Sequence, residues 1–191
     1  MNQEIKSWKR IRSEEIANCR VFTLRRDLCV RDTEFEELEN EEHTFYVLDC
    51  PAWCNIIPVT DRNEVVLIEQ FRQGTETVSL EIPGGIVDEG ETPEAGAERE
   101  LLEETGYAAR EIVFLGKSNP NPAIQNNWVY HFAAFGCEKK QEPQFDGSEH
   151  CVERVVSLSE IDDLILNEEI THSLVLAGFQ RFNIHQNKKN L

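Results

Sequence analysis

Long apolar runs are missing from this chain of 191 residues. No stretch of about 18 apolar residues is present to span a bilayer. The opening segment, MNQEIKSWKRIRSEE, lacks the apolar stretch of a secretion signal. Internal repeats and low-complexity tracts are absent as well. We therefore expect a protein of the cytoplasm that does not contact a membrane, with enough residues for one compact domain and a sizeable core.

Basic residues are scarce. The chain has 19 Lys and Arg against 36 Asp and Glu, a formal net charge of −17 at pH 7. A negatively charged surface does not bind the phosphate backbone of nucleic acid well, which argues against a duplex or a long RNA as partner. The same field repels small anions. A diphosphate ligand would therefore have to meet locally bound metal and a few placed cations.

The six cysteines include no CxxC pair. In a chain without a secretion signal, we expect these thiols to be reduced and partly buried. Cys50 and Cys54 as metal ligands are the weaker alternative, because a spacing of this kind alone is not typical of a metal site.

The most informative segment is GIVDEGETPEAGAERELLEETGY, at residues 85–107. Thr92 is a good N-cap, Pro93 suits the first helical position, and Gly106 suits the left-handed residue that follows a last turn. These signals predict a helix from about Pro93 to Thr105.

At roughly 100° per residue, one side of this helix is acidic and the other side packs. Glu100, Glu103 and Glu104 converge within one turn, and like charges at that spacing repel unless a cation joins them. Mg²⁺ or Mn²⁺ would do so, because hard cations prefer carboxylate oxygens and leave positions for phosphate oxygens and an attacking water. Arg99, four residues before Glu103, is expected to hold that carboxylate in place. The acidic stretch 34–42 is instead typical of a solvated surface.

Strand patterns precede and follow the acidic helix. Ser157 with Glu160 forms a possible capping box for a helix to about Leu166, and Thr171 could cap a last helix through Phe182. A helix between strands predicts a mixed sheet sandwiched by helices. We expect an N-terminal strand region at residues 1–50 and a catalytic domain at residues 51–191. The predicted strands are 20–30, 44–48, 52–59, 65–71, 78–82, 111–115, 128–135 and 152–157.

The order of Gly85, five residues, Glu91, seven residues and then RELLEETGY resembles the signature of the Nudix hydrolase family. Only Tyr107 departs from it, where the pattern usually has an aliphatic residue. The resemblance implies an α/β fold, a Nudix-type α/β/α sandwich with a mixed sheet and an N-terminal antiparallel strand region. It also implies Mg²⁺, or Mn²⁺, as cofactor. The implied metal ligands are Glu100, Glu103, Glu104 and the main-chain carbonyl at Gly85.

Two further segments, EQFR at 69–72 and LEIPGG at 80–85, are similar to the ADP-ribose and nucleoside diphosphate sugar pyrophosphatase branch of the family. In that branch the arginine matching Arg72 contacts phosphate and the glutamate matching Glu81 lies at the site. An Arg fork can hold two phosphate oxygens, and Glu81 could accept a ribose hydroxyl or a metal-bound water. A surface arginine and a strand-end salt bridge are the alternatives. Pro122 matches a proline that follows the box in this branch, although Pro120 lies close by.

Members of this branch usually form homodimers in which the N-terminal strands cross to the neighbour and aromatic side chains clasp the base. Phe22 and Trp53 are the candidates for this stacking. Ordinary core or interface packing is the alternative for Trp53.

The family commonly supplies a glutamate from a flexible loop after the main sheet to deprotonate the attacking water. Glu149 best matches that position. His150 and His172 are single histidines without a catalytic partner at a characteristic sequence spacing. Such histidines are more often surface or core residues than bases. The other candidates for the base are Asp146, Glu142 and a glutamate within the box, such as Glu103.

The resemblance therefore predicts a metal-dependent hydrolase that cleaves ADP-ribose or a related nucleoside diphosphate sugar into a nucleoside monophosphate and a sugar phosphate. One alternative is a Nudix pyrophosphatase for another nucleotide, such as a nucleoside triphosphate, a dinucleoside polyphosphate, coenzyme A or capped RNA. The other is a non-catalytic sensor that binds a nucleotide sugar.

Overall fold

The computed structural model describes residues 7–31, 42–145, 147 and 150–189. The chain divides into two compact units. The first, called here the N-terminal unit, comprises Met1–Pro51 and Asn121–Asn127, and the second, the main unit, comprises Ala52–Pro120 and Trp128–Leu191. The assignment of residues 1–50 and 51–191 as separate domains stays a prediction.

The N-terminal unit is an antiparallel sheet in the order β1-β2-β3. Its strands are β1 (Trp8–Asn18), β2 (Thr23–Arg31) and β3 (Glu42–Asp49). Strands β2 and β3, which overlap the predicted strands 20–30 and 44–48, pair with Thr23 opposite Asp49 and Val30 opposite Glu42. Strand β1 was not predicted, because its sequence WKRIRSEEIAN is charged and nearly all of its residues are exposed.

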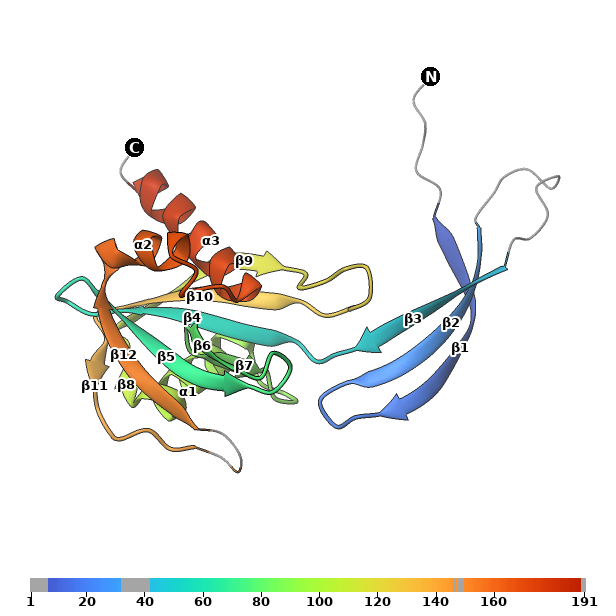
Figure 1. Cartoon of the computed structure of the whole chain (residues 1–191), viewed down its shortest axis with the longest axis horizontal. Helices are drawn as coiled ribbons and strands as arrows, with labels where there is room; N and C mark the ends of the chain where they lie inside the picture. The colour runs from blue at the N-terminus through green and yellow to red at the C-terminus, as the bar shows by residue number, and fades with distance from the viewer. Residues whose placement is uncertain (1–6, 32–41, 146, 148–149, 190–191) are drawn as a thin grey trace, which may run out of the picture. The chain divides into compact units, whose positions relative to one another are not determined.

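The main unit contains a seven-stranded mixed sheet in the order β12-β5-β4-β10-β9, with β6 paired to β5 and β7 paired to β4 (Figure 1). Only the β4–β10 pair is parallel among these pairings. A small second sheet joins β8 (Tyr107–Ala108) to β11 (Glu138–Lys139). The large sheet is formed by β4 (Trp53–Val59), β5 (Glu64–Arg72), β6 (Thr77–Glu81), β7 (Gly84–Ile86), β9 (Glu111–Ser118), β10 (Val129–Phe135) and β12 (Cys151–Ser157).

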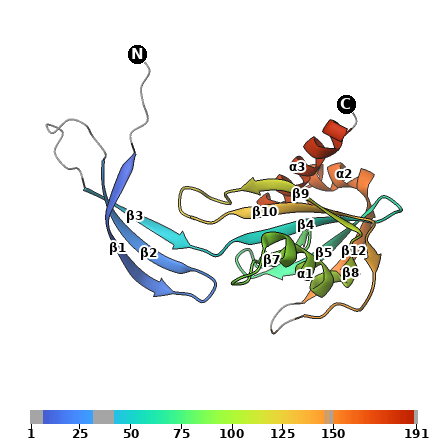
Figure 2. The same ribbon diagram turned by 180° about the vertical axis from the view of Figure 1, so that it is seen from behind.

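Helices cover both faces of this sheet (Figures 1 and 2). Because side chains alternate along a strand, Ile56 and Phe132 pack in a core beneath α1 (Pro93–Thr105), whereas Ile57 and Ala133 face the opposite core. That opposite core is closed by the short helix α2 (Ile161–Leu166), which follows the 3₁₀ turn Leu158–Glu160, and by α3 (Ser173–Lys189). The predicted α/β/α sandwich with a mixed sheet is confirmed.

Local signals placed two helix starts correctly. Thr92 caps α1 by accepting a hydrogen bond from the Ala95 amide, and Gly106 ends it at a φ of 74°. Ser157 and Glu160 form the expected capping box. The last helix runs to Lys189, about two turns beyond the predicted end at Phe182. None of the helices within the described ranges is both long and apolar enough to cross a bilayer.

Candidate active site

The acidic face of α1 lies against β7, the short strand that precedes it in the chain. Two glycines make this approach possible. A Cβ on Gly84 would overlap the Cys54 carbonyl on the neighbouring strand β4, and a Cβ on Gly85 would overlap the Glu100 carboxylate. A larger residue at Gly84 would push β7 away from its strand partner, and one at Gly85 would displace the Glu100 carboxylate.

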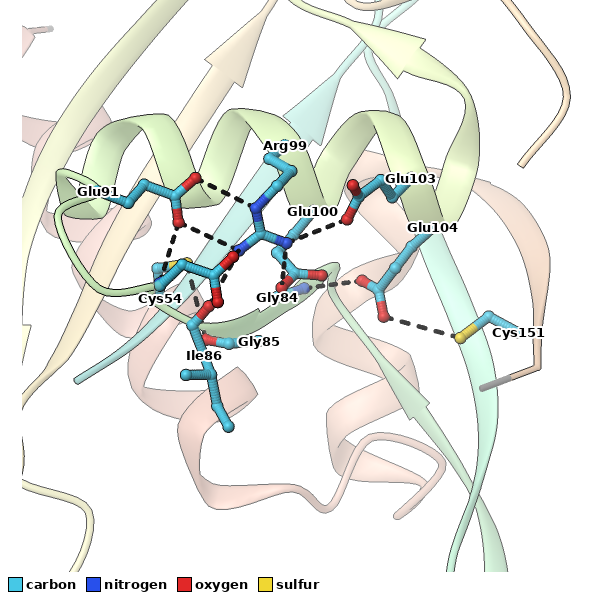
Figure 3. A network of polar contacts seen from close by, with 11 residues as sticks. Cys54, Gly84, Gly85, Ile86, Glu91, Arg99, Glu100, Glu103, Glu104 and Cys151 are labelled. Carbon is cyan, nitrogen blue, oxygen red and sulfur yellow. Dashed lines mark hydrogen bonds and ion pairs between the residues drawn. The ribbon is translucent and has the colours of Figure 1, made fainter. Parts of the chain in front are cut away.

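Arg99 lies at the centre of the carboxylate cluster (Figure 3). Its Nη1 donates to Glu100 Oε1 at 2.9 Å and to Glu103 Oε2 at 3.0 Å. Its Nε and Nη2 donate to the two oxygens of Glu91, each at 3.1 Å, and Nη2 also donates to the Ile86 carbonyl at 3.0 Å. One guanidinium therefore joins α1 to the loop before it and to the end of β7.

The protonation states in this cluster follow from those contacts. The hydrogen bonds from Arg99 lower the pKa of Glu91 below its ordinary value. The bonds to Glu91, followed by the charge of Glu100, raise the pKa of Arg99 above its already high value, although burial acts against this. The guanidinium is thus a permanent cation that offsets the repulsion between neighbouring carboxylates.

Glu104 is held by different partners. Its side chain is buried, and its Oε2 accepts a hydrogen bond from the Gly84 amide at 2.8 Å. The Cys151 thiol, on β12, lies 3.7 Å from the other oxygen, at the distance of a weak S–H donor. Glu104 therefore connects the last turn of α1 with the first residue of β7 and with the start of β12.

These donors fit a hard divalent cation. The three carboxylates of the last turns of α1 are all oxygen ligands, and the close approach of Gly85 to Glu100 places a main-chain segment beside them. Within the described part of the chain, no three His, Cys, Asp or Glu side chains form a ready-made metal cage. A cation would share Glu100 and Glu103 with Arg99, which holds one oxygen of each carboxylate, and phosphate oxygens and waters would complete its shell.

The cysteine thiols lie in different surroundings. All six are free, and four of them are buried. The Cys54 thiol lies 3.7 Å from the Gly85 carbonyl, and burial raises its pKa to about 12, so it is a neutral donor at physiological pH. Cys50 belongs to the N-terminal unit, where it lies 3.8 Å from the Gln125 amide nitrogen. Sequence reasoning missed the contacts of Cys54 and Cys151, because thiols without metal spacing give no pattern.

Arg72 and Glu81 meet across the β5–β6 hairpin. Arg72 Nε donates to Glu81 Oε1 at 2.7 Å and Nη2 donates to Oε2 at 2.8 Å, a two-pronged ion pair. His172, just before α3, brings Nδ1 within 3.2 Å of the same Oε2. Arg72 also experiences the charge of Glu104, which places the pair beside the acidic face of α1. The position of His172 could not be found from the sequence, since it is far from Glu81 along the chain.

The remaining predicted residues belong to both units or lie outside the described residues. Phe22 is half-buried in the N-terminal unit just before β2, and Pro122 is exposed in the 121–127 segment of the same unit. Trp53 begins β4 in the main unit, half-buried and paired in register with Ile86 and Val129. Glu149 and its rival Asp146 lie outside the described residues.

The segment that leads toward residue 149 is tied to the end of α1. The Lys140 and Gln141 amides donate to the Gly106 carbonyl, and the Gln144 amide donates to the Glu103 carbonyl at 2.7 Å. Glu142, within this segment, is exposed. These bonds hold residues 140–144 beside the helix that carries the carboxylates.

Known proteins of similar sequence and fold share this architecture. The model of the NUDIX domain matches residues 51–178. The chain is 29% identical over 179 residues to the ADP-ribose pyrophosphatase of Bacillus subtilis (strain 168), covering 93% of this chain and 94% of that protein. It is 27% identical over 183 residues to the methanol dehydrogenase activator of Bacillus methanolicus, covering 95% and 96%. A crystal structure of an ADP compounds hydrolase superposes with a TM-score of 0.84 over 98% of both chains at 19% identity, which shows a shared fold.

Proposed function

This chain belongs to the Nudix hydrolase family, and we propose that it hydrolyses the diphosphate of ADP-ribose or a related nucleoside diphosphate sugar to a nucleoside monophosphate and a sugar phosphate. Enzymes of this family generally use divalent metals, and a small nucleotide fits the family as substrate. Mg²⁺ is the cation we propose, with Mn²⁺ as a substitute.

The observation that carries the proposal is the carboxylate cluster of α1, fixed to β7 by Arg99 and Gly84. A cluster of this kind is suited to hold a hard cation against a diphosphate. The ADP-ribose pyrophosphatase of Bacillus subtilis, similar along nearly its whole length, supports a nucleotide sugar as the substrate.

The residues divide the work as follows. A divalent cation bound there would neutralise the diphosphate and lower the pKa of an attacking water. Glu100, Glu103, Glu104 and the Gly85 carbonyl are the proposed ligands, and Arg99 positions Glu100 and Glu103. Arg72 contacts the diphosphate and is oriented by Glu81.

A general base must take a proton from the water, and Glu149 is the proposed residue, with Glu103, Glu142 and Asp146 as rivals. Phe22 and Trp53 are proposed to stack on the base, and Pro122 to contact the substrate. We further propose that the protein is a cytoplasmic homodimer with its N-terminal strand region at the interface.

A second candidate function is favoured by one relative. The methanol dehydrogenase activator of Bacillus methanolicus is named for an effect on another enzyme and is similar over almost its whole length. A chain of this type could therefore bind a nucleotide and act on a partner protein. Tight binding of a nucleotide sugar without turnover in Mg²⁺ would support that role.

The decisive experiment incubates the purified protein with ADP-ribose, other nucleotide sugars, nucleoside triphosphates, dinucleoside polyphosphates and coenzyme A in Mg²⁺. Products are separated by chromatography. Glu104→Gln removes one proposed ligand, and Glu98→Gln, on an exposed position of the same helix, is the matched control. We expect AMP and ribose phosphate from ADP-ribose with the wild type and Glu98→Gln, but not with Glu104→Gln or after chelation. Turnover confined to another substrate class would refute the nucleotide-sugar assignment.

A further inference from the structure

Glu81 is a buried carboxylate that holds two basic side chains at one place. Glu81 is 2% exposed, whereas the side chain of Arg72 is 41% exposed and that of His172 is 38% exposed. The guanidinium Nη2 and the imidazole Nδ1 both approach the same atom, Oε2, at 2.8 and 3.2 Å. Because they share one oxygen, the two basic groups lie side by side at the surface.

The charge of this cluster is well defined. Burial alone would raise the pKa of Glu81, but the polar contacts and charges of Arg72 and His172 outweigh burial and lower the pKa far below its ordinary value. Glu81 is therefore ionised. Two of the three guanidinium nitrogens of Arg72 are directed at this carboxylate, which leaves Nη1 as the nitrogen not used by Glu81.

The imidazole has a defined orientation as well. Its Nδ1 is buried and lies 3.2 Å from Glu81 Oε2 without forming a hydrogen bond, while 38% of the side chain is exposed, so the Nε2 edge of the ring faces outward. An imidazole donates from either nitrogen, and from both when it is charged. With a carboxylate at Nδ1 and an anionic ligand at Nε2, each N–H group would have an acceptor.

The segment that carries His172 is firmly anchored. The Asn55 side-chain amide donates to the Leu174 carbonyl at 3.1 Å, and Asn55 Oδ1 lies 2.8 Å from His131 Nδ1. The other nitrogen of His131 lies 2.7 Å from Ser118 Oγ. This buried network connects β4, β9 and β10 to the first turn of α3, so the imidazole two residues earlier is held in position rather than carried by a loose end.

The cluster also lies next to the proposed metal ligands. Glu81 is followed by Ile82, Pro83 and Gly84, and the Gly84 amide binds the Glu104 carboxylate. Arg99 is surrounded by the carboxylates of α1 and its preceding loop, with distances of 3.1 Å or less to three of them. An anionic substrate that enters this acidic surface therefore needs basic groups other than Arg99.

We propose that His172 is a substrate-binding residue, which donates a hydrogen bond from Nε2 to the diphosphate beside Arg72, and that Glu81 positions both. The substrate class rests on the proposed function. The diphosphate would thus be held between the metal ligands of α1 on one side and the Arg72–His172 pair on the other.

The test measures the affinity of inorganic pyrophosphate in Mg²⁺ by calorimetry, which needs no turnover. His172→Leu removes the donor, and His172→Gln restores an N–H group at similar reach. His185→Leu, about 20 Å further along α3, is the matched control. We expect His172→Leu to bind about 10-fold more weakly, the usual effect of losing one hydrogen bond to a charged group. His172→Gln should recover most of the loss, and His185→Leu should match the wild type.

Steady-state kinetics on whichever nucleotide the wild type cleaves provide the second readout. His172→Leu should raise KM about 10-fold and leave kcat within about twofold, because a ground-state contact is lost. Unchanged pyrophosphate affinity in His172→Leu, or no pyrophosphate binding by the wild type, would overturn the proposal. Weaker pyrophosphate binding by His172→Leu in a protein that cleaves no nucleotide sugar would support the inference and reject only the proposed substrate.

Discussion

The buried Arg72–Glu81 pair should contribute measurably to stability, and Glu81→Gln tests this. The substitution keeps the shape of the side chain but leaves a guanidinium facing a neutral amide. Removing one partner of a buried pair costs about 3–5 kcal/mol. Because the Arg72 side chain is 41% exposed and can regain water, we discount this to about 2 kcal/mol. Urea unfolding at pH 7 should show a midpoint lower by about 1 M.

The pH dependence gives this prediction its sign. The pKa of Glu81 is lowered in the folded protein, so its stabilising contribution is full above the ordinary pKa of about 4.5 and is lost as the pH falls toward the folded value. At pH 3 the unfolded chain gains about 2 kcal/mol from protonating this group. The gap between wild type and Glu81→Gln should therefore close between about pH 4.5 and 3.

The chain offers a control that is also a two-pronged ion pair but is not buried. Arg110 donates hydrogen bonds from both of its terminal nitrogens to Asp61, and both side chains are 61% exposed. Asp61→Asn should leave the urea midpoint almost unchanged, because water replaces the lost contact. An equal loss of stability in Asp61→Asn and Glu81→Gln, or a Glu81→Gln gap that does not change with pH, would refute the role assigned to burial.

Three further outcomes are expected. Arg99→Met should reduce turnover about 100-fold and weaken Mn²⁺ binding, because Glu91, Glu100 and Glu103 lose the guanidinium that holds them in position. Electron paramagnetic resonance measures the Mn²⁺ affinity, and an unchanged affinity would contradict this. Gly85→Ala should lower kcat/KM about 10-fold or more, since its Cβ overlaps Glu100, whereas Gly74→Ala, in open space, should not. Burial lowers the pKa of His131 to about 4, so the free energy of unfolding should decline by about 3 kcal/mol as the pH falls from about 6.5 to 4. The decline should be much smaller in His131→Gln, and an equal pH dependence of urea unfolding in the wild type and His131→Gln would refute this.

How far the sequence could predict this molecule depended on how local each signal was. Helix α1 was placed correctly because its cap, its proline and its terminal glycine all act within the segment itself. The strands of the main sheet carry apolar residues that must be buried, so their positions were also foreseeable. Strand β1 escaped prediction because its pairing with β2 buries little and leaves a charged, exposed pattern.

The acidic half of the site was predicted from spacing on one helix, whereas its basic half depends on tertiary structure. Glu100, Glu103 and Glu104 meet because of the helical repeat. Arg72 and Glu81 meet because the β5–β6 register sets Arg72 opposite Thr77 and Ile68 opposite Glu81, which places both side chains on one face of the hairpin. His172 joins them only because α3 packs on the sheet through Asn55 and His131. No pattern within the sequence reports that packing.

This difference bears on how such a site can change its substrate. Arg99 contacts three carboxylates and the Ile86 carbonyl, so replacing any one of these residues disturbs the whole acidic cluster. The basic pair depends on a single buried carboxylate and on the anchored start of α3, and its outer edges face solvent. Residues at those outer edges can therefore vary without moving the metal ligands. We infer that substitutions of Arg72 or His172 change the affinity for the diphosphate, while substitutions within the α1 cluster change diphosphate cleavage itself.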